Sequence, residues 1–128
     1  MKSISPSEAL DLCKKGTIFL DIREEFETAA RRFDVPNTLF LPNSCLKEDF
    51  DKLPRNKAII VADSVGLRSK EAVLFLEGHG FEIVMNLAGG IVDWERTGHK
   101  VITNPKEMLH GQCVCTLKSE SGTKSDFK

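Results

Sequence analysis

Residues 58–80 read AIIVADSVGLRSKEAVLFLEGHG, and the rest of the chain is arranged around this stretch. Residues 58–62 form a continuous apolar run, which is typical of a strand buried on both faces of a parallel sheet. Gly66 follows in a loop and can adopt a positive φ. Ser69 is well placed to help cap the next helix. The apolar face of that helix consists of Ala72, Val73, Phe75 and Leu76. The stretch therefore predicts a buried strand, a six-residue loop and a helix.

The loop is predicted to form a cradle for an anion. Its six residues are Asp63, Ser64, Val65, Gly66, Leu67 and Arg68. Backbone N–H groups at the start of a helix have no partner within the helix, so those of residues 64–69 are free to point into the loop. The helix dipole and the charge of Arg68 add positive potential there. The loop begins, however, with Asp63, which is itself an anion.

The flanking segments alternate between strands and helices. Further strands are expected at residues 2–4, 17–22, 38–41 and 82–87. Further helices are expected at residues 5–16, 24–32, 46–53 and 91–97, the first of them with Ser5 and Glu8 as a capping box and Pro6 at its first position. This alternation indicates βαβ units, and hence an α/β fold with one parallel sheet. Ligands of such sheets bind at the carboxyl ends of the strands, where Asp21, Asp63 and Asn86 fall.

Composition favours one soluble domain. The chain has 128 residues, with 41% hydrophobic residues, 29% charged residues and a formal net charge of −1. This balance favours neither nucleic acid nor a membrane surface as a partner. The first ten residues lack the apolar core of a secretory signal, so we expect a cytoplasmic protein.

Four pieces of the sequence resemble the rhodanese-like (sulfurtransferase) domain over about residues 3–102. They are DIREEFE (21–27), IIVADSVGLRSKEA (59–72), FLEGHGF (75–81) and NLAGGI (86–91) followed by Trp94 and Gly98. The resemblance implies a five-stranded parallel sheet with helices on both faces. It also implies a persulfide-carrying cysteine as the first residue of the loop, where this chain has Asp63. Residues 32–37 (RFDVPN) depart from the His-Ile-Pro-Gly-Ala segment usual in the family.

A carboxylate forms no persulfide, so we expect Asp63 to act as a built-in anion that satisfies the cradle and repels sulfate, thiosulfate or phosphate. The alternative is a polar loop residue that points to solvent. Arg68 would either reach an anion or the Asp63 carboxylate, or brace the loop through Asp21 or Glu27, and we favour bracing. The cluster of Asp21, Arg23 and Glu27 indicates structural ion pairs at strand ends more than an acid/base pair.

The cysteines are expected to be reduced, with Cys13 packed in the core. Cys113 and Cys115 form a Cys-x-Cys pair after His110. Three interpretations remain open for them: incidental thiols in an extended tail, a metal site with His110 as third ligand, or a redox or sulfur-carrying pair that folds back to the loop. His79 and His99 are expected at surface turns.

The leading hypothesis is a catalytically inactive rhodanese-like domain at residues 1–102 that acts as a binding or regulatory module. Residues 103–118 would form a Cys-containing extension, and residues 119–128 a disordered tail. The alternatives are a sulfurtransferase or persulfide carrier that uses Cys113 and Cys115, and a metal-binding or redox-sensing protein on the same fold. No cofactor is expected, and the partner would be an unknown protein or a small anion.

Overall fold

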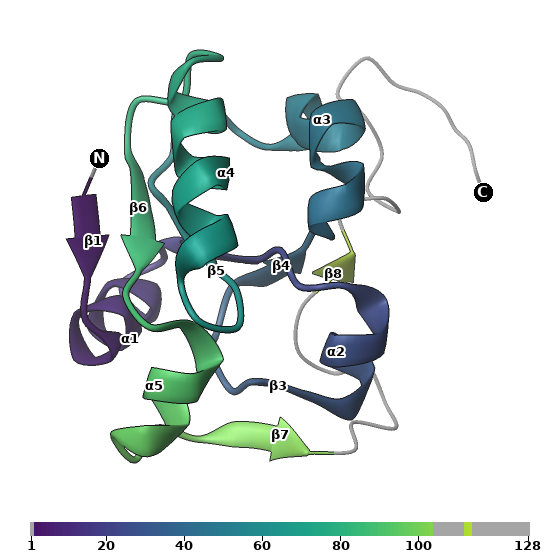
Figure 1. Cartoon of the computed structure of the whole chain (residues 1–128). Helices are drawn as coiled ribbons and strands as arrows, with labels where there is room; N and C mark the ends of the chain where they lie inside the picture. Colours follow the sequence, from purple (N-terminus) through teal and green to yellow (C-terminus); the bar gives the residue numbers. More distant parts are fainter. Residues whose placement is uncertain (1, 104–111, 114–128) are drawn as a thin grey trace.

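The computed structural model describes residues 2–103 and 112–113. Its main sheet has the strand order β1-β6-β5-β2-β4-β8, and every neighbouring pair is parallel. The strands are β1 (Lys2–Ile4), β2 (Ile18–Asp21), β4 (Thr38–Phe40), β5 (Ile59–Ala62), β6 (Val84–Leu87) and β8 (Gln112–Cys113). The first five confirm the expected five-stranded parallel sheet, and β8 adds a two-residue strand at its edge (Figure 1).

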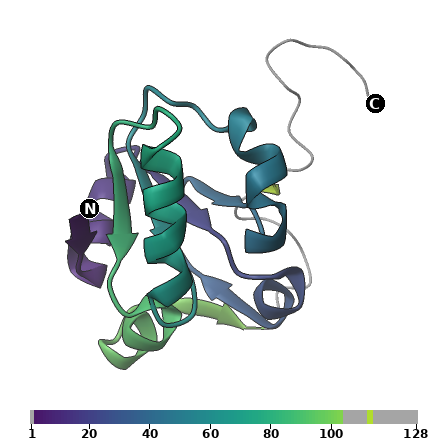
Figure 2. The ribbon, with the colours of Figure 1, turned by 45° about the horizontal axis from the view of Figure 1, so that its top comes forward.

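Helices cover both faces of this sheet, as expected (Figures 1 and 2). They are α1 (Pro6–Lys14), α2 (Glu25–Ala30), α3 (Leu46–Asp49), α4 (Leu67–Glu77) and α5 (Gly90–Arg96). One apolar core contains side chains of α3 and α4, and the other contains side chains of α1 and α5. Strand β5 contributes Ile59 and Val61 to the first core and Ile60 and Ala62 to the second. Successive side chains of a strand point to opposite faces, so a fully apolar strand serves two cores.

The capping box of α1 is confirmed. The Glu8 amide donates to Ser5 Oγ at 3.2 Å, and the Ser5 amide donates to Glu8 Oε1 at 3.2 Å. Pro6 occupies the first helical turn, where a missing N–H costs nothing. Residues within one turn of each other therefore determine where this helix begins.

Two expected helices are shorter than predicted. The helix expected at residues 24–32 ends at Ala30, because Arg31–Phe33 forms β3 and pairs with the antiparallel strand β7 (Val101–Thr103). The helix expected at residues 46–53 is a single turn, α3, between 3₁₀ turns at Asn43–Cys45 and Phe50–Lys52.

None of the helices at residues 2–103 has the length and apolar content that a bilayer crossing requires. His110, Cys115 and the tail at residues 119–128 lie outside the described residues, so the predictions made for them remain predictions.

Candidate functional site: the loop after β5

Three polar residues lie together at the carboxyl ends of neighbouring strands. Asp21 ends β2 and pairs in register with Ala62 of β5, directly before Asp63, while Asn86 of β6 pairs with Val61. Asp21 and Asn86 have no exposed surface, and Asp63 is 1% exposed. Parallel pairing thus collects these side chains at one edge of the sheet.

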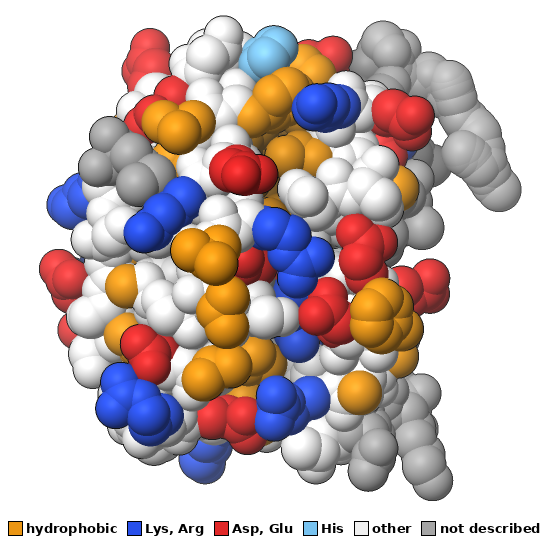
Figure 3. Space-filling model, viewed as in Figure 1, with side chains coloured by type: hydrophobic (Ala, Val, Ile, Leu, Met, Phe, Trp, Pro, Cys, Tyr) orange, Lys and Arg blue, Asp and Glu red, His pale blue; other side chains and the backbone are white. Residues whose placement is uncertain are grey.

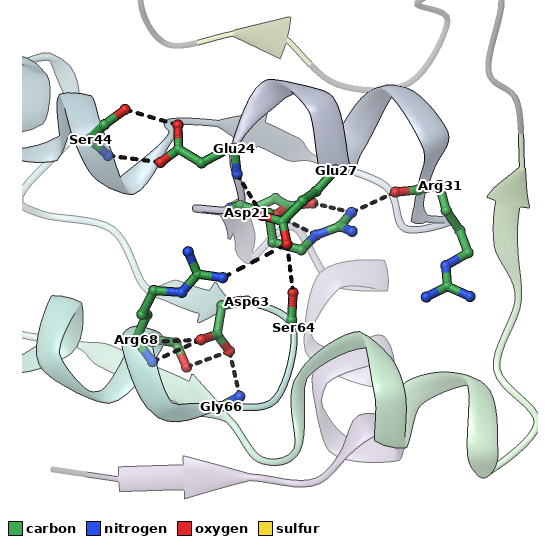
Figure 4. Close-up of polar contacts among 11 residues, drawn as sticks. Asp21, Glu24, Glu27, Arg31, Ser44, Asp63, Ser64, Gly66 and Arg68 are labelled. Atoms are coloured by element: carbon green, nitrogen blue, oxygen red, sulfur yellow. Dashed lines mark hydrogen bonds and ion pairs between the residues drawn. The ribbon is translucent and has the colours of Figure 1, made fainter.

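The Asp63 carboxylate accepts hydrogen bonds from three backbone amides. Gly66 donates to Oδ1, Arg68 donates to Oδ2 at 2.8 Å, and Ser69 donates to Oδ2 at 3.3 Å (Figure 4). Gly66, with φ 93°, is the residue before α4, so these amides are the ones left unpaired at the helix start. Since Asp63 is buried and bonded in this way, the alternative of a side chain that points to solvent is wrong.

Ser69 does not cap α4, which corrects the expectation for this residue. The helix begins at Leu67, so Ser69 lies inside its first turn, and the Asp63 carboxylate takes the capping role. The Ser69 hydroxyl instead contacts Asp63 Oδ1 at 3.3 Å and bonds Asn86 Oδ1. Asn86 Nδ2 donates in turn to Ser3 Oγ at 3.2 Å. The position of Asn86 at the end of a strand was predicted from the sequence, but its bonds to Ser69 and Ser3 were not.

Asp21 and Arg23 form a buried ion pair. Arg23 donates to Asp21 through its amide at 3.0 Å, its Nε at 3.1 Å and its Nη2 at 3.1 Å. Nη2 also donates to the Arg31 carbonyl at 2.7 Å. Burial raises the pKa of Asp21 above its ordinary value, and the Arg23 guanidinium opposes that rise. Because the two groups bind each other and Arg23 also binds the Arg31 carbonyl, the geometry supports a structural role.

Glu27 connects α2 to the loop. Its Oε2 accepts from Ser64 Oγ at 3.1 Å and lies 3.8 Å from Arg68 Nη2, while its Oε1 accepts from the Glu24 amide at 3.0 Å (Figure 4). Among the carboxylates expected as partners of the Arg68 side chain, Glu27 is therefore the one that forms an ion pair with it. The Arg68 side chain is 43% exposed, so this ion pair is a weak contact.

A groove of about 480 Å³ lies beside the loop. Its lining is Arg23, Phe26, Glu27, Ala30, Arg31, Ser64, Ile91 and Val92. The groove thus lies between α2, the start of the loop and α5, with apolar and charged side chains in its wall.

The amino end of α5 supports the loop from behind. The Ile91 amide donates to the Asp63 carbonyl at 3.0 Å, and the Val92 amide donates to the Ser64 carbonyl at 3.1 Å. Gly90 has φ 60°, and a Cβ there would lie 2.3 Å from the Ser64 carbonyl carbon. Only glycine allows this approach of two backbones.

The structure places Cys113 far from the loop. Its backbone in β8 pairs with Phe40 of β4, and Phe40 pairs in turn with Asp21 of β2. Three strand spacings of about 4.8 Å separate Cys113 from β5, a distance of about 14 Å. Within residues 2–103, together with residues 112–113, no group of three His, Cys, Asp or Glu side chains is arranged to hold a metal ion.

The fold and the site define a class: single-domain α/β proteins with an amide-lined loop between a buried strand and a helix. Residues 5–97 match the rhodanese-like domain family, and this match covers most of the chain. The chain belongs to the rhodanese-like domain family.

Relatives with this domain include sulfur-transferring enzymes. The chain is 32% identical to the thiosulfate sulfurtransferase GlpE of Haemophilus influenzae over 99 residues, which cover 74% of this chain and 89% of that protein. It is 29% identical to a sulfurtransferase of Allochromatium vinosum over 88 residues, 69% of this chain and 80% of that protein.

Solved structures agree with this assignment. A rhodanese-related protein from Thermoplasma volcanium superposes with a TM-score of 0.71 at 32% identity, covering 80% of this chain and 98% of that one. The polysulfide-sulfur transferase homodimer from Wolinella succinogenes gives a TM-score of 0.70 at 25% identity, covering 80% and 78% of the two chains.

Proposed function

We propose that this protein is a rhodanese-like domain without sulfurtransferase activity, which acts as a binding or regulatory module through the face around residues 63–68. By the resemblance of the loop, Asp63 stands where the sulfurtransferases of this family carry their persulfide-forming cysteine. A carboxylate cannot attack a sulfane sulfur or carry it as a persulfide. The domain would keep the scaffold and lack the nucleophile.

The single observation that carries this proposal is the occupied amide cradle. The Asp63 carboxylate already accepts the N–H groups of Gly66, Arg68 and Ser69, and it is buried. A bound anion such as thiosulfate would have to compete for the same donors against a fixed negative charge a few ångströms away. The loop is therefore satisfied from within, and binding would use the surface around it.

A thiosulfate–cyanide assay tests the proposal. We expect no thiocyanate above background from the wild-type chain and measurable turnover from Asp63→Cys, with Asp63→Ser as the control of similar size that cannot form a persulfide. Turnover by the wild-type chain, or a 32 Da sulfur adduct on the native protein, would contradict it.

The tail-thiol alternative has its own outcome in the same assay. If the wild-type chain were active, loss of that activity in a Cys113→Ser, Cys115→Ser double variant would assign the sulfur to the tail. For Cys113, the position of β8 argues against this alternative, since β4 and β2 lie between β8 and the strand that precedes the loop.

A further inference from the structure

Helix α2 has no buried residue to hold it against the rest of the protein. None of its six residues is buried, and Phe26 is 76% exposed. A helix of this length has little stability of its own in water. Its position therefore depends on the contacts that its ends and its polar side chains make.

Both ends of the segment at residues 24–30 are fixed by one side chain. Arg23, which is 3% exposed, binds Asp21 at the end of β2 and also donates to the Arg31 carbonyl at 2.7 Å. Arg31 then begins β3, which pairs with β7. The two ends are thus anchored to the body of the protein by the contacts of Arg23 and by the pairing of β3 with β7, and the seven residues between them belong to neither sheet.

Two carboxylates, one at the start of the segment and one in its middle, bind neighbouring parts of the protein. Glu27 accepts from the Ser64 hydroxyl at 3.1 Å and lies 3.8 Å from Arg68 Nη2. Glu24 accepts from the Ser44 amide at 3.1 Å and from its hydroxyl at 2.9 Å (Figure 4). These contacts lie at the surface or are partly buried, where water can replace them at small cost.

We propose that residues 24–30 form a lid over the groove beside the loop, hinged at Arg23 and Arg31 and latched by Glu24 and Glu27. Phe26, Glu27 and Ala30 form the lid's share of the groove wall, and Ser64 and α5 form the opposite side. Release of Glu27 widens the groove and frees the Ser64 hydroxyl and the Arg68 guanidinium from their contacts with it. The side chains on this face are mixed apolar, basic and acidic, as Figure 3 shows for the surface over α2 and α4.

The regulatory meaning of the lid rests on the proposed role of this face in binding, but its motion does not. Lid opening is measured on the full chain without any ligand, whereas the proposed function is tested by thiosulfate turnover. A rigid α2 would overturn the lid and leave the proposed function intact. Sulfurtransferase activity of the wild-type chain would overturn the proposed function and leave the lid intact.

Residue-resolved amide hydrogen exchange by NMR tests the lid. In the wild-type chain, we expect the amides of residues 28–30 to exchange at least about a hundredfold faster than those of β5, since they open without global unfolding. Glu27→Ala should raise that rate by about tenfold more, because Glu27 loses its bonds to the Ser64 hydroxyl and to the Glu24 amide at the start of α2. Ser64→Ala removes the first of these bonds alone. Glu25→Ala is the matched control: it removes a first-turn carboxylate from the same helix, so the change in helix-dipole interaction is similar, and we expect less than about a twofold change.

A second variant tests the same contact in case Glu27→Ala does not fold. Ser64→Ala removes the latch from the loop side and should raise the same exchange rates, while those of β5 stay unchanged. Exchange of residues 28–30 at the rate of β5 would overturn the lid. Equal effects of Glu27→Ala and Glu25→Ala would overturn the latch.

Discussion

At the residue scale, a buried carboxylate is tolerated only when hydrogen bonds replace its lost hydration. Asp63 meets this condition with backbone donors, and Asp21 meets it with a guanidinium. The two aspartates therefore differ in what they need: Asp63 depends on the shape of the loop, and Asp21 depends on one side chain.

Asp63→Asn should lower the free energy of unfolding by about 2 kcal/mol, because charge-assisted bonds to the loop amides are weakened and an NH₂ group faces N–H donors. Urea denaturation at pH 7 measures this change. The control is Asp93→Asn, which breaks an exposed pair with Arg96 at 2.9 Å and should cost less than about 1 kcal/mol. Equal losses in the two variants would show that the loop amides do not depend on the carboxylate.

Asp21→Asn should cost more, about 3–5 kcal/mol, because it leaves the Arg23 guanidinium buried without its counter-ion. Glu95→Gln breaks the 2.6 Å pair with Arg31, whose side chains are 41% and 35% exposed for Arg31 and Glu95, and should cost under about 1 kcal/mol. Thermal denaturation of both variants ranks them. A stability loss at Asp21 no larger than that at Glu95 would refute the importance of the buried pair.

At the element scale, the sequence was sufficient wherever local chemistry decides the structure. The capping box of α1 and the apolar run of β5 depend on residues within a few positions of one another, so they were predicted correctly. The end of α2 was not, because β3 forms only by pairing with β7, about seventy residues later. A long-range partner of that kind leaves no local signal at residues 31–33.

The site also combines local features, which the sequence predicts, with contacts between distant residues, which it does not. The amide cradle followed from the order strand, loop and helix, and Asp63 lies within it. Ser69 contacts Asn86, and Glu24 contacts Ser44. Both contacts join separate elements, so no spacing in the sequence predicts them. The helix began two residues before the expected cap, and this shift alone turned Ser69 from a capping residue into a bridge between α4 and β6.

The contact between α5 and the loop gives a prediction with a matched control. Gly90→Ala should lower the free energy of unfolding by about 3 kcal/mol or more, because its Cβ would overlap the backbone of Ser64 and Asp63 in addition to the strain of a positive φ. Gly98→Ala has a similar strain, with φ 89°, but its Cβ meets no atom within 4 Å, so about 1–2 kcal/mol is expected. Urea denaturation of both variants isolates the packing contribution, and equal losses would contradict the close approach.

At the scale of the whole molecule, the sheet separates two apolar cores that differ in their relation to the site. The core under α4 lies behind the helix whose amides bind Asp63. The other core, under α1 and α5, contains Cys13 with no exposed surface, packed with Phe19, Phe33 and Trp94. A thiol buried in this way behaves as an apolar group, so its ionisation and its reactivity depend on whether the protein is folded.

Burial raises the pKa of Cys13 from its ordinary value of 9.0 to about 12. Between these two pH values the unfolded chain loses the thiol proton while the folded chain keeps it, so the free energy of unfolding should fall with rising pH. The slope from this group is about 1.4 kcal/mol per pH unit above pH 9, and below pH 9 its stabilising contribution is fully present. Comparison with Cys13→Ala isolates this part of the pH dependence, because the other titrating groups are common to both chains.

Alkylation provides an independent measurement on the same residue. With iodoacetamide at pH 8, Cys13 of the folded protein should remain unmodified, while the half-buried Cys45 reacts, and both should react in urea. Peptide mass mapping distinguishes the two sites. Since the Cys13 thiol has no exposed surface and lies in the core on the α1 side of the sheet, we expect its rate of modification to depend on unfolding of that core and to be insensitive to Glu27→Ala, which changes contacts of α2 alone. Equal rates for Cys13 and Cys45 in the folded protein would contradict the buried position of the Cys13 thiol.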